Sequence, residues 1–170
     1  MRHSDRYSST QIALHWLVVL LVLVQLVFND SVSRAYEVGL RTGELDPNEG
    51  GVVPHAVVGI SIFLAMSARL WLRLSRGVPP PSSSEPRWMQ IVARINHWAF
   101  YGVLLAMPPL GVLALMTLEP IFGTLHSALV WILLALVLLH IGGALLHWVR
   151  PGSNAHRRML RAYSDTPPAD

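Results

Sequence analysis

Four long apolar stretches dominate the chain, and short polar segments separate them. The stretches lie near residues 10–28, 52–74, 91–116 and 123–149. Each is long enough to cross about 30 Å of hydrocarbon as a helix that rises about 1.5 Å per residue. We therefore predict an all-α integral membrane protein, a four-helix up-down bundle. A single domain would occupy residues 1–163, and residues 164–170 read as a disordered tail.

The connections between these spans differ in length and chemistry. Residues 29–51 form a polar segment that we interpret as a loop, and residues 75–87 contain prolines that cannot continue a helix. The third connection, residues 117–123, is so short that the last two spans should be antiparallel neighbours. Pro108 and Pro109 are predicted to kink or break the third span and to free backbone carbonyls.

Composition supports the membrane class and narrows the chemistry. Apolar residues make up 52% of the 170 positions and charged residues 14%, which is too little charge for a water-soluble domain of this size. The chain has no cysteine. Disulfides, thiolate metal sites and the covalent attachment of a c-type haem are therefore excluded, and any metal must be bound by histidine, carboxylate or methionine.

All thirteen basic residues are arginine, and their distribution predicts an orientation. Arg34 and Arg41 lie in the first connection, whereas the other 11 lie on the opposite side of the bundle. Because cytoplasmic segments are enriched in basic residues, both termini should face the cytoplasm. The arginines flank apolar spans, so the lipid bilayer and its anionic head groups are the predicted partner, and nucleic acid is not.

Histidine is concentrated in the apolar stretches. Six of the eight histidines fall in or at the edge of a predicted span: His15, His55, His97, His126, His140 and His147. One such histidine could be an interhelical hydrogen bond worth about 1 kcal/mol, or an interfacial side chain. Because ionisable groups at membrane depth are costly, six together indicate a ligand set that faces the bundle interior.

Four of these histidines form two pairs when they are compared by their expected depth in the membrane. His126 and His140 are 14 residues apart in the fourth span, or about 21 Å along a helix, and about 40° short of four full turns. His140 therefore lies in the cytoplasmic half, at the depth of His15, and His126 lies near the outer face, at the depth of His55. We predict one pair of facing imidazoles at each depth.

Two opposed histidines on different helices are the usual way to hold a b-type haem without covalent attachment. We therefore predict two b-type haems stacked across the membrane, with His15 and His140 binding the cytoplasmic-side iron and His55 and His126 binding the outer-side iron. Small residues near the ligands would leave room for the porphyrins: Gly59, Ala128, Gly142 and Gly143.

Two histidines leave alternatives open. His147 lies seven residues beyond His140 and only about 20° away around the helix, so it competes as a ligand. Its place beside Trp148 and Arg150 is typical of an interfacial anchor. His97, at the cytoplasmic end of the third span, could bond a haem propionate or a quinone carbonyl, or lie at the interface.

Four segments together resemble the bacterial cytochrome b561 family. They are RYSSTQIALHW in the first span, PHAVVGISIFLAMSARLWLRL in the second, INHWAFYGVLLAMPPLGVL in the third, and the His126–His140 pair in the fourth. The resemblance implies two haem b groups on the same four histidines and a location in the bacterial inner membrane. It also implies electron transfer among quinone, haem and a second partner. Some members oxidise superoxide at the outer face and pass the electron to ubiquinone.

The outer charge does not favour superoxide. The first connection carries two arginines against five carboxylates, a local balance of −3, and Glu119 adds another negative charge. An anion would be steered poorly to such a surface. Electron transfer between a donor and membrane quinone is therefore the main prediction. With both axial positions filled it would be outer-sphere, and superoxide:ubiquinone oxidoreductase activity remains an open alternative.

Two other functions compete. The chain could be the haem-binding membrane anchor of a quinone-linked dehydrogenase or hydrogenase, which would require a redox partner protein. It could also be a histidine-lined metal transporter, which would need acidic ligands at mid-membrane. No Asp or Glu lies well inside any predicted span, which argues against transport.

Overall fold

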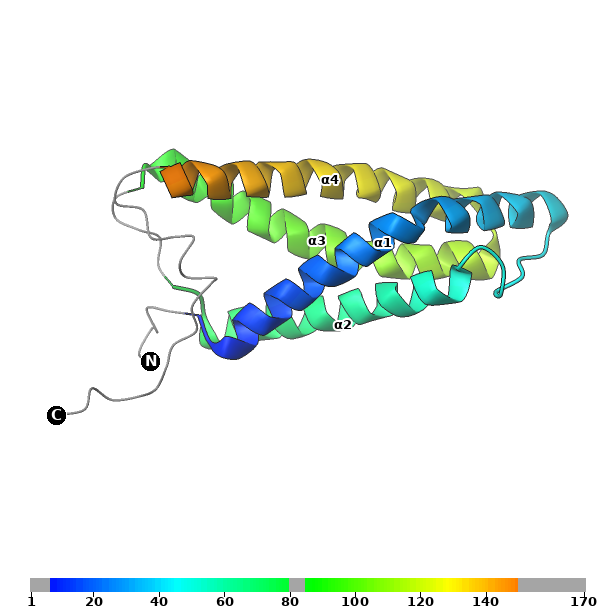
Figure 1. The fold of residues 1–170 in the computed structure, drawn as a ribbon, viewed down its shortest axis with the longest axis horizontal. Coiled ribbons are helices and arrows are strands. Elements are labelled where there is room, and N and C mark those ends of the chain that lie inside the picture. The colour runs from blue at the N-terminus through cyan, green and yellow to red at the C-terminus, as the bar shows by residue number, and fades with distance from the viewer. Residues whose placement is uncertain (1–6, 80–84, 150–170) are drawn as a thin grey trace.

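Four long helices make up the described part of the chain, residues 7–79 and 85–149, in the computed structural model (Figure 1). They are α1 (Ser9–Thr42), α2 (Val52–Arg76), α3 (Arg87–Thr117) and α4 (Pro120–Val149). Each contains a stretch long and apolar enough to cross a membrane, which confirms the prediction of four spans. The tail at 164–170 lies outside the described residues.

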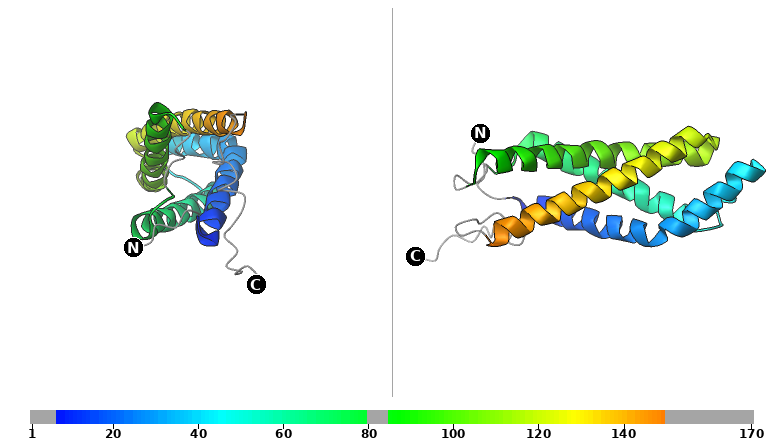
Figure 2. Two further views of the ribbon diagram at one scale, coloured as in Figure 1. Left: turned by 90° about the vertical axis from the view of Figure 1, so that its left-hand side faces the viewer. Right: turned by 90° about the horizontal axis from the view of Figure 1, so that it is seen from above.

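The helices alternate in direction, so each end of the bundle combines the starts of two helices with the ends of the other two (Figure 1). At one end α1 and α3 begin and α2 and α4 finish, and we call it the basal end. At the other, the distal end, lie the start of α2 and the short turn between α3 and α4. Seen end-on, the four helices surround a common axis (Figure 2). Close packing joins α1 to α2, α2 to α3 and α3 to α4, whereas α4 makes few close approaches to α1 or α2.

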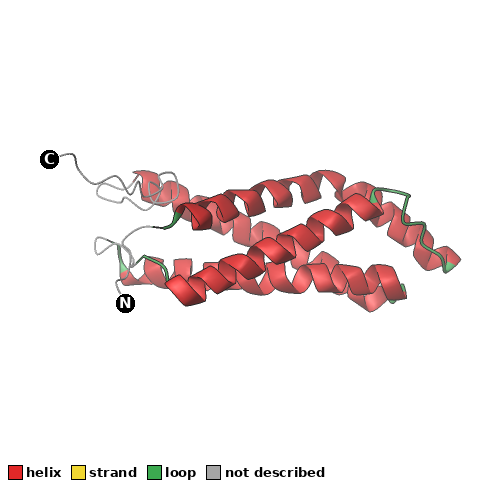
Figure 3. Ribbon diagram, turned by 90° about the horizontal axis from the view of Figure 1, so that it is seen from below, coloured by secondary structure: helices red, strands yellow, loops and turns green. Residues whose placement is uncertain are grey.

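The segment between the first two spans corrects the sequence interpretation. Residues 29–42 were predicted as loop, but α1 continues through them without interruption (Figure 3). Val32, Ala35 and Gly39 are buried at helical spacing, so one stripe of this segment is apolar although its composition is polar. The helix ends at Gly43, which adopts the left-handed conformation (φ 78°) that favours glycine.

This continuation of α1, residues 28–42, is called the distal extension below. It docks on the turn between α3 and α4: the Tyr36 hydroxyl donates to the Glu119 carbonyl at 3.3 Å. A Cβ atom at Gly123 would lie only 2.6 Å from the Tyr36 ring, so glycine is needed for this approach. The distal extension therefore supplies cover at the distal end that the sequence did not predict.

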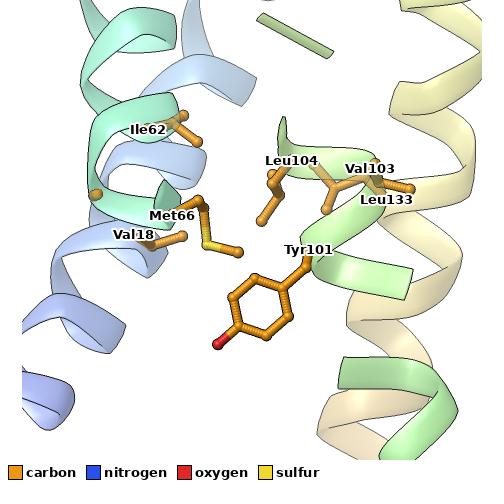
Figure 4. Packing of buried hydrophobic residues seen from close by; sticks show 8 residues of the cluster. Val18, Ile62, Met66, Tyr101, Val103, Leu104 and Leu133 are labelled. Atoms are coloured by element: carbon orange, nitrogen blue, oxygen red, sulfur yellow. The ribbon is translucent and has the colours of Figure 1, made fainter. Parts of the chain in front are cut away.

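The apolar core lies midway along the bundle and draws on all four helices (Figure 4). Its buried members are Val18, Ile62, Ala65, Met66, Tyr101, Val103, Leu104 and Leu133. Leu133 lies seven residues from His126 and seven from His140, so the core separates two layers of histidines. Large apolar side chains such as Val27, Trp131 and Leu138 are instead exposed on the outside, where a membrane protein meets lipid.

The third helix is not broken at its two prolines. α3 runs from Arg87 to Thr117 through Pro108 and Pro109. Because proline has no N–H, the carbonyls of Leu104 and Leu105 lose their helical donors there. A break is therefore wrong, because the third span is one continuous helix, and the kink stays a prediction.

Candidate functional site

The distal layer contains one pair of facing imidazoles. The ring centroids of His55 on α2 and His126 on α4 are 6.1 Å apart, with an interplanar angle of 62°. The two side chains are half-buried. They bridge two helices that are not closely packed against each other.

The basal layer contains a second pair. The centroids of His15 on α1 and His140 on α4 are 6.2 Å apart, at 59°. These residues also bridge helices with few close backbone approaches, α1 and α4. The structure thus brings together the two pairs of side chains that are expected, from their positions along the spans, to lie at the same membrane depth.

The separation of the rings can be compared with what a metal ion between them would need. A metal–imidazole bond of about 2 Å on each side, with about 1 Å from each nitrogen to its ring centre, requires roughly 6 Å. An in-line hydrogen bond between two imidazoles would bring the centres to roughly 5 Å. The observed 6.1 and 6.2 Å fit a shared metal ion better than a direct hydrogen bond.

His126 is held in one tautomer by the third helix. Its Nδ1 atom lies 2.9 Å from the carbonyl oxygen of Met107. A carbonyl can only accept, so Nδ1 carries the proton and Nε2 keeps a lone pair for a metal. The ring is seated against Gly111, where an added Cβ atom would lie 3.0 Å from the His126 ring. Sequence reasoning missed Gly111.

His55 is positioned through its backbone. Its carbonyl accepts a hydrogen bond from Gln25 Nε2 of α1 at 2.9 Å, and Gly59 leaves room for that amide. Its Nδ1 atom is buried and has no hydrogen-bond partner in the described structure. Because buried polar atoms are normally paired, an orphaned imidazole nitrogen fits a residue that serves a bound group.

The basal layer is more crowded than the distal one. The His97 ring lies 5.5 Å from that of His140, and Phe100 lies 5.6 Å from it on another side. The ring centroids of Trp16 and His15 are 5.4 Å apart, and the two rings are nearly perpendicular. His97 therefore joins the basal layer as a direct neighbour of His140, at a separation closer to ring contact than to a shared metal ion.

Two arginines of α2 also reach this layer. Arg69 Nη1 donates to the Gln11 carbonyl at 3.1 Å, and Tyr101 lies near its guanidinium. The guanidinium carbon of Arg73 lies 5.1 Å from the Trp98 ring centre and 5.7 Å from that of Tyr101. Figure 4 shows the Tyr101 ring pointing from α3 into the space between the helices.

The two layers are related by one spacing on three helices. His126 and His140 are 14 residues apart on α4, and the same spacing separates His55 from Arg69 on α2 and His97 from Gly111 on α3. Residues 14 apart lie near one stripe of a helix, so each stripe serves both layers. This repeat is the sequence signal that points to Arg69 and Gly111.

Other residues predicted from the sequence are not seen at the site in the described structure. The His147 side chain lies outside the described residues, as does that of Trp148, and so does Arg150. An added Cβ atom at Gly142 or Gly143 would meet no other group within 4 Å. Within the described ranges, no group of three or more His, Asp or Glu side chains converges to hold a metal ion. Each facing pair offers two ligands, which suits haem iron because the porphyrin supplies the remaining positions.

Comparisons with known proteins identify the family of the chain. The sequence matches the family profile described as prokaryotic cytochrome b561 over residues 6–162. It is 27% identical over 161 residues to cytochrome b562 of Cereibacter sphaeroides, covering 95% of this chain and 99% of that protein. It is 26% identical over 110 residues to the probable superoxide oxidase CybB of Yersinia pestis, covering 63% of this chain but only 56% of that protein.

Proposed function

Because the chain belongs to the prokaryotic cytochrome b561 family, we propose that it carries electrons across or along the membrane through two b-type haems. His15 and His140 would bind the basal haem iron, and His55 and His126 the distal one. The observation that carries this proposal is the pair of ring separations, 6.2 and 6.1 Å, across helices that are not packed together.

The residues of the chain have distinct roles in this function. When bound, haem would supply one-electron chemistry, the four histidines would hold its iron, and electrons would pass by outer-sphere transfer. The Met107 carbonyl orients His126 and keeps its Nε2 lone pair available. The apolar core around Met66, Leu104 and Leu133 excludes water between the layers.

Charge supports an orientation for the bundle. The basal end carries Arg73, Arg76 and Arg87 in its last and first helical turns, whereas Arg34 and Arg41 lie in the distal extension. The positive-inside rule then makes the basal end cytoplasmic in a bacterial inner membrane. Membrane quinone, for example ubiquinone, is the proposed electron partner within the bilayer.

Superoxide is a second candidate donor, and it is supported by the name of the Yersinia relative. The acidic character of the distal segment, which includes Glu37, Glu44 and Asp46, argues for slow capture of an anion. Reaction of the purified protein with superoxide decides between this activity and a haem-binding anchor that needs a soluble redox partner.

The absorption spectrum of the purified protein tests the proposal. After reduction it should show a b-type α-band, and the haem content should be two per chain. His55→Ala or His126→Ala should remove one haem, and His15→Ala or His140→Ala the other. Leu138→Ala, at a lipid-facing position 72% exposed on the same helix as two ligands, should retain both. A reduced protein without an α-band would contradict the assignment, and full haem retention in His140→Ala would assign the basal ligand to His147.

A further inference from the structure

Arg69 brings a positive charge to membrane depth in the basal layer. It lies 14 residues after His55 and about two helical turns before α2 ends at Arg76. Its side chain is half-buried, and its Nη1 atom bonds the carbonyl of Gln11, one helical turn before His15 on α1. Arginine does not lose its proton in proteins, so it cannot escape the cost of burial by becoming neutral.

The partners of Arg69 in the described part of the chain are all uncharged or positive. It donates to the Gln11 carbonyl, Tyr101 lies nearby, and Arg73 lies one turn away on the same helix. No carboxylate pairs with it within residues 7–79 and 85–149. A buried charge is normally paired, and a charge inside a membrane bundle usually marks a functional partner. An anion at the basal pair would supply the opposite charge that these described residues do not.

Among the residues that the structure describes, the distal layer has no comparable charge beside His55 and His126. Around its two rings lie Gly111, which seats His126, and the neutral amide of Gln25, which bonds the His55 carbonyl. The two layers thus offer the same pair of imidazoles in different electrostatic surroundings. A site with a nearby cation stabilises an added electron more than a site without one.

We propose that Arg69 is a positioning residue for the haem of the basal pair: it binds a propionate carboxylate of that haem and makes the basal site the easier of the two to reduce. The inference rests on the proposed function, because it requires haem at His15 and His140. The Gln11 carbonyl holds the Arg69 guanidinium in place, and Arg73 packs against Trp98 and Tyr101. An electron shared by the two sites resides mainly on the basal one.

A redox titration of the purified two-haem protein tests this inference, with the α-band as readout. Arg69→Gln should lower the midpoint potential of one component. At a fixed ambient potential, the ratio of reduced to oxidised haem in that component should fall by about tenfold or more. The other component should not move. Arg69→Lys keeps the charge and should restore most of the shift. Arg94→Gln, an exposed arginine at the same end, should leave both components unchanged.

The component that shifts is assigned with single-haem variants. His126→Ala, which should keep only the basal haem, should show the effect of Arg69→Gln, and His15→Ala should not. If Arg69→Gln instead loses haem, loss of the basal haem alone with retention in Arg69→Lys supports the same contact. Loss of both haems together would assign Arg69 to folding and overturn the inference.

Three further outcomes would overturn it. The first is an unchanged basal midpoint in Arg69→Gln, and the second is an equal shift of both components. The third is a shift that appears in vesicles containing anionic lipid and is absent in neutral detergent, which would make a lipid phosphate the partner of Arg69. Absence of haem from the unmodified protein would instead refute the proposed function itself, so the two failures are distinguishable.

Discussion

The Nδ1 atom of His126 lies 2.9 Å from the carbonyl oxygen of Met107, the residue directly before Pro108 and Pro109. The contact joins α4 to α3, although the facing imidazole of His55 comes from α2. One helix therefore orients the ring and another opposes it. A ligand held in this way is fixed in tautomer and direction before any metal binds, because the carbonyl accepts only the Nδ1 proton.

Gly111→Ala should weaken distal haem binding. The new methyl group would lie about 3.0 Å from the His126 ring, so the imidazole must move away from its place beside Met107. We expect a several-fold loss of one haem on dilution or in competition with an apo-haem acceptor, with the basal haem retained. Gly102→Ala is the matched control, since it makes the same change on the same helix in open space. Equal haem retention in the two variants would contradict the prediction.

Removal of haem should loosen the bundle. The two histidine pairs connect α4 to α1 and to α2, the helices to which α4 has few direct contacts. A ligand that binds only the folded state stabilises it by about 2.7 kcal/mol when its free concentration is 100 times Kd. Thermal unfolding followed by circular dichroism in one detergent should therefore give a lower midpoint for the apo-protein. A His126→Ala protein with one haem should unfold between the two, and identical midpoints would exclude a bridging role.

Gly123→Ala should release the distal extension. A Cβ atom there would meet the Tyr36 ring at 2.6 Å, so Tyr36 and the helix that carries it must move. Trypsin cleavage after Arg34 and Arg41 should then become several-fold faster, because cleavage of a helix requires local opening. Gly142→Ala, where an added Cβ meets no neighbour, should leave the cleavage rate unchanged. A Gly123→Ala protein as resistant as the control would show that the extension is held elsewhere.

Docking of the extension should also depend on pH, at the alkaline end. Partial burial and the negative charge of Glu119 raise the pKa of Tyr36 above its ordinary value near 10. Because the pKa is higher in the folded state, the stabilising contribution is complete below the unfolded pKa and is lost as the pH rises through the folded pKa. Trypsin resistance, or hydrogen exchange in the extension, should be constant from pH 7 to about pH 9 and decrease above pH 10. Tyr36→Phe should abolish this alkaline change, and the same change in that variant would assign it to another group.

Much of the site follows from two periodicities in the sequence. The lengths of the apolar stretches give four spans, and the 14-residue spacing of His126 and His140 gives two layers. Helix direction then assigns His15 to one layer and His55 to the other. These inferences succeed because depth along a helix is a linear function of residue number. The roles of the four side chains as haem ligands remain a prediction.

Other features depend on the rotation and tilt of one helix against another, which residue number does not contain. His97 is at a depth that sequence can estimate, but its contact with His140 depends on how α3 turns toward α4. The same is true of Met107 and Gly111 beside His126, and of Arg69 beside Tyr101. A scan for residues 14 apart would have found Arg69 and Gly111 as positions, without their partners.

The membrane class, the four spans and the two levels of imidazoles follow from the amino-acid sequence alone, because hydropathy and helical rise are properties of the local chain. The remaining features depend on how the helices pack. Residues 29–42 are polar in composition, so their sequence favours a loop. In the structure they are helical, and Tyr36 packs on the turn at Glu119 and Gly123. The difference in charge between the layers likewise arises only when α2 brings Arg69 beside α1, because an electrostatic environment is made by neighbours in space.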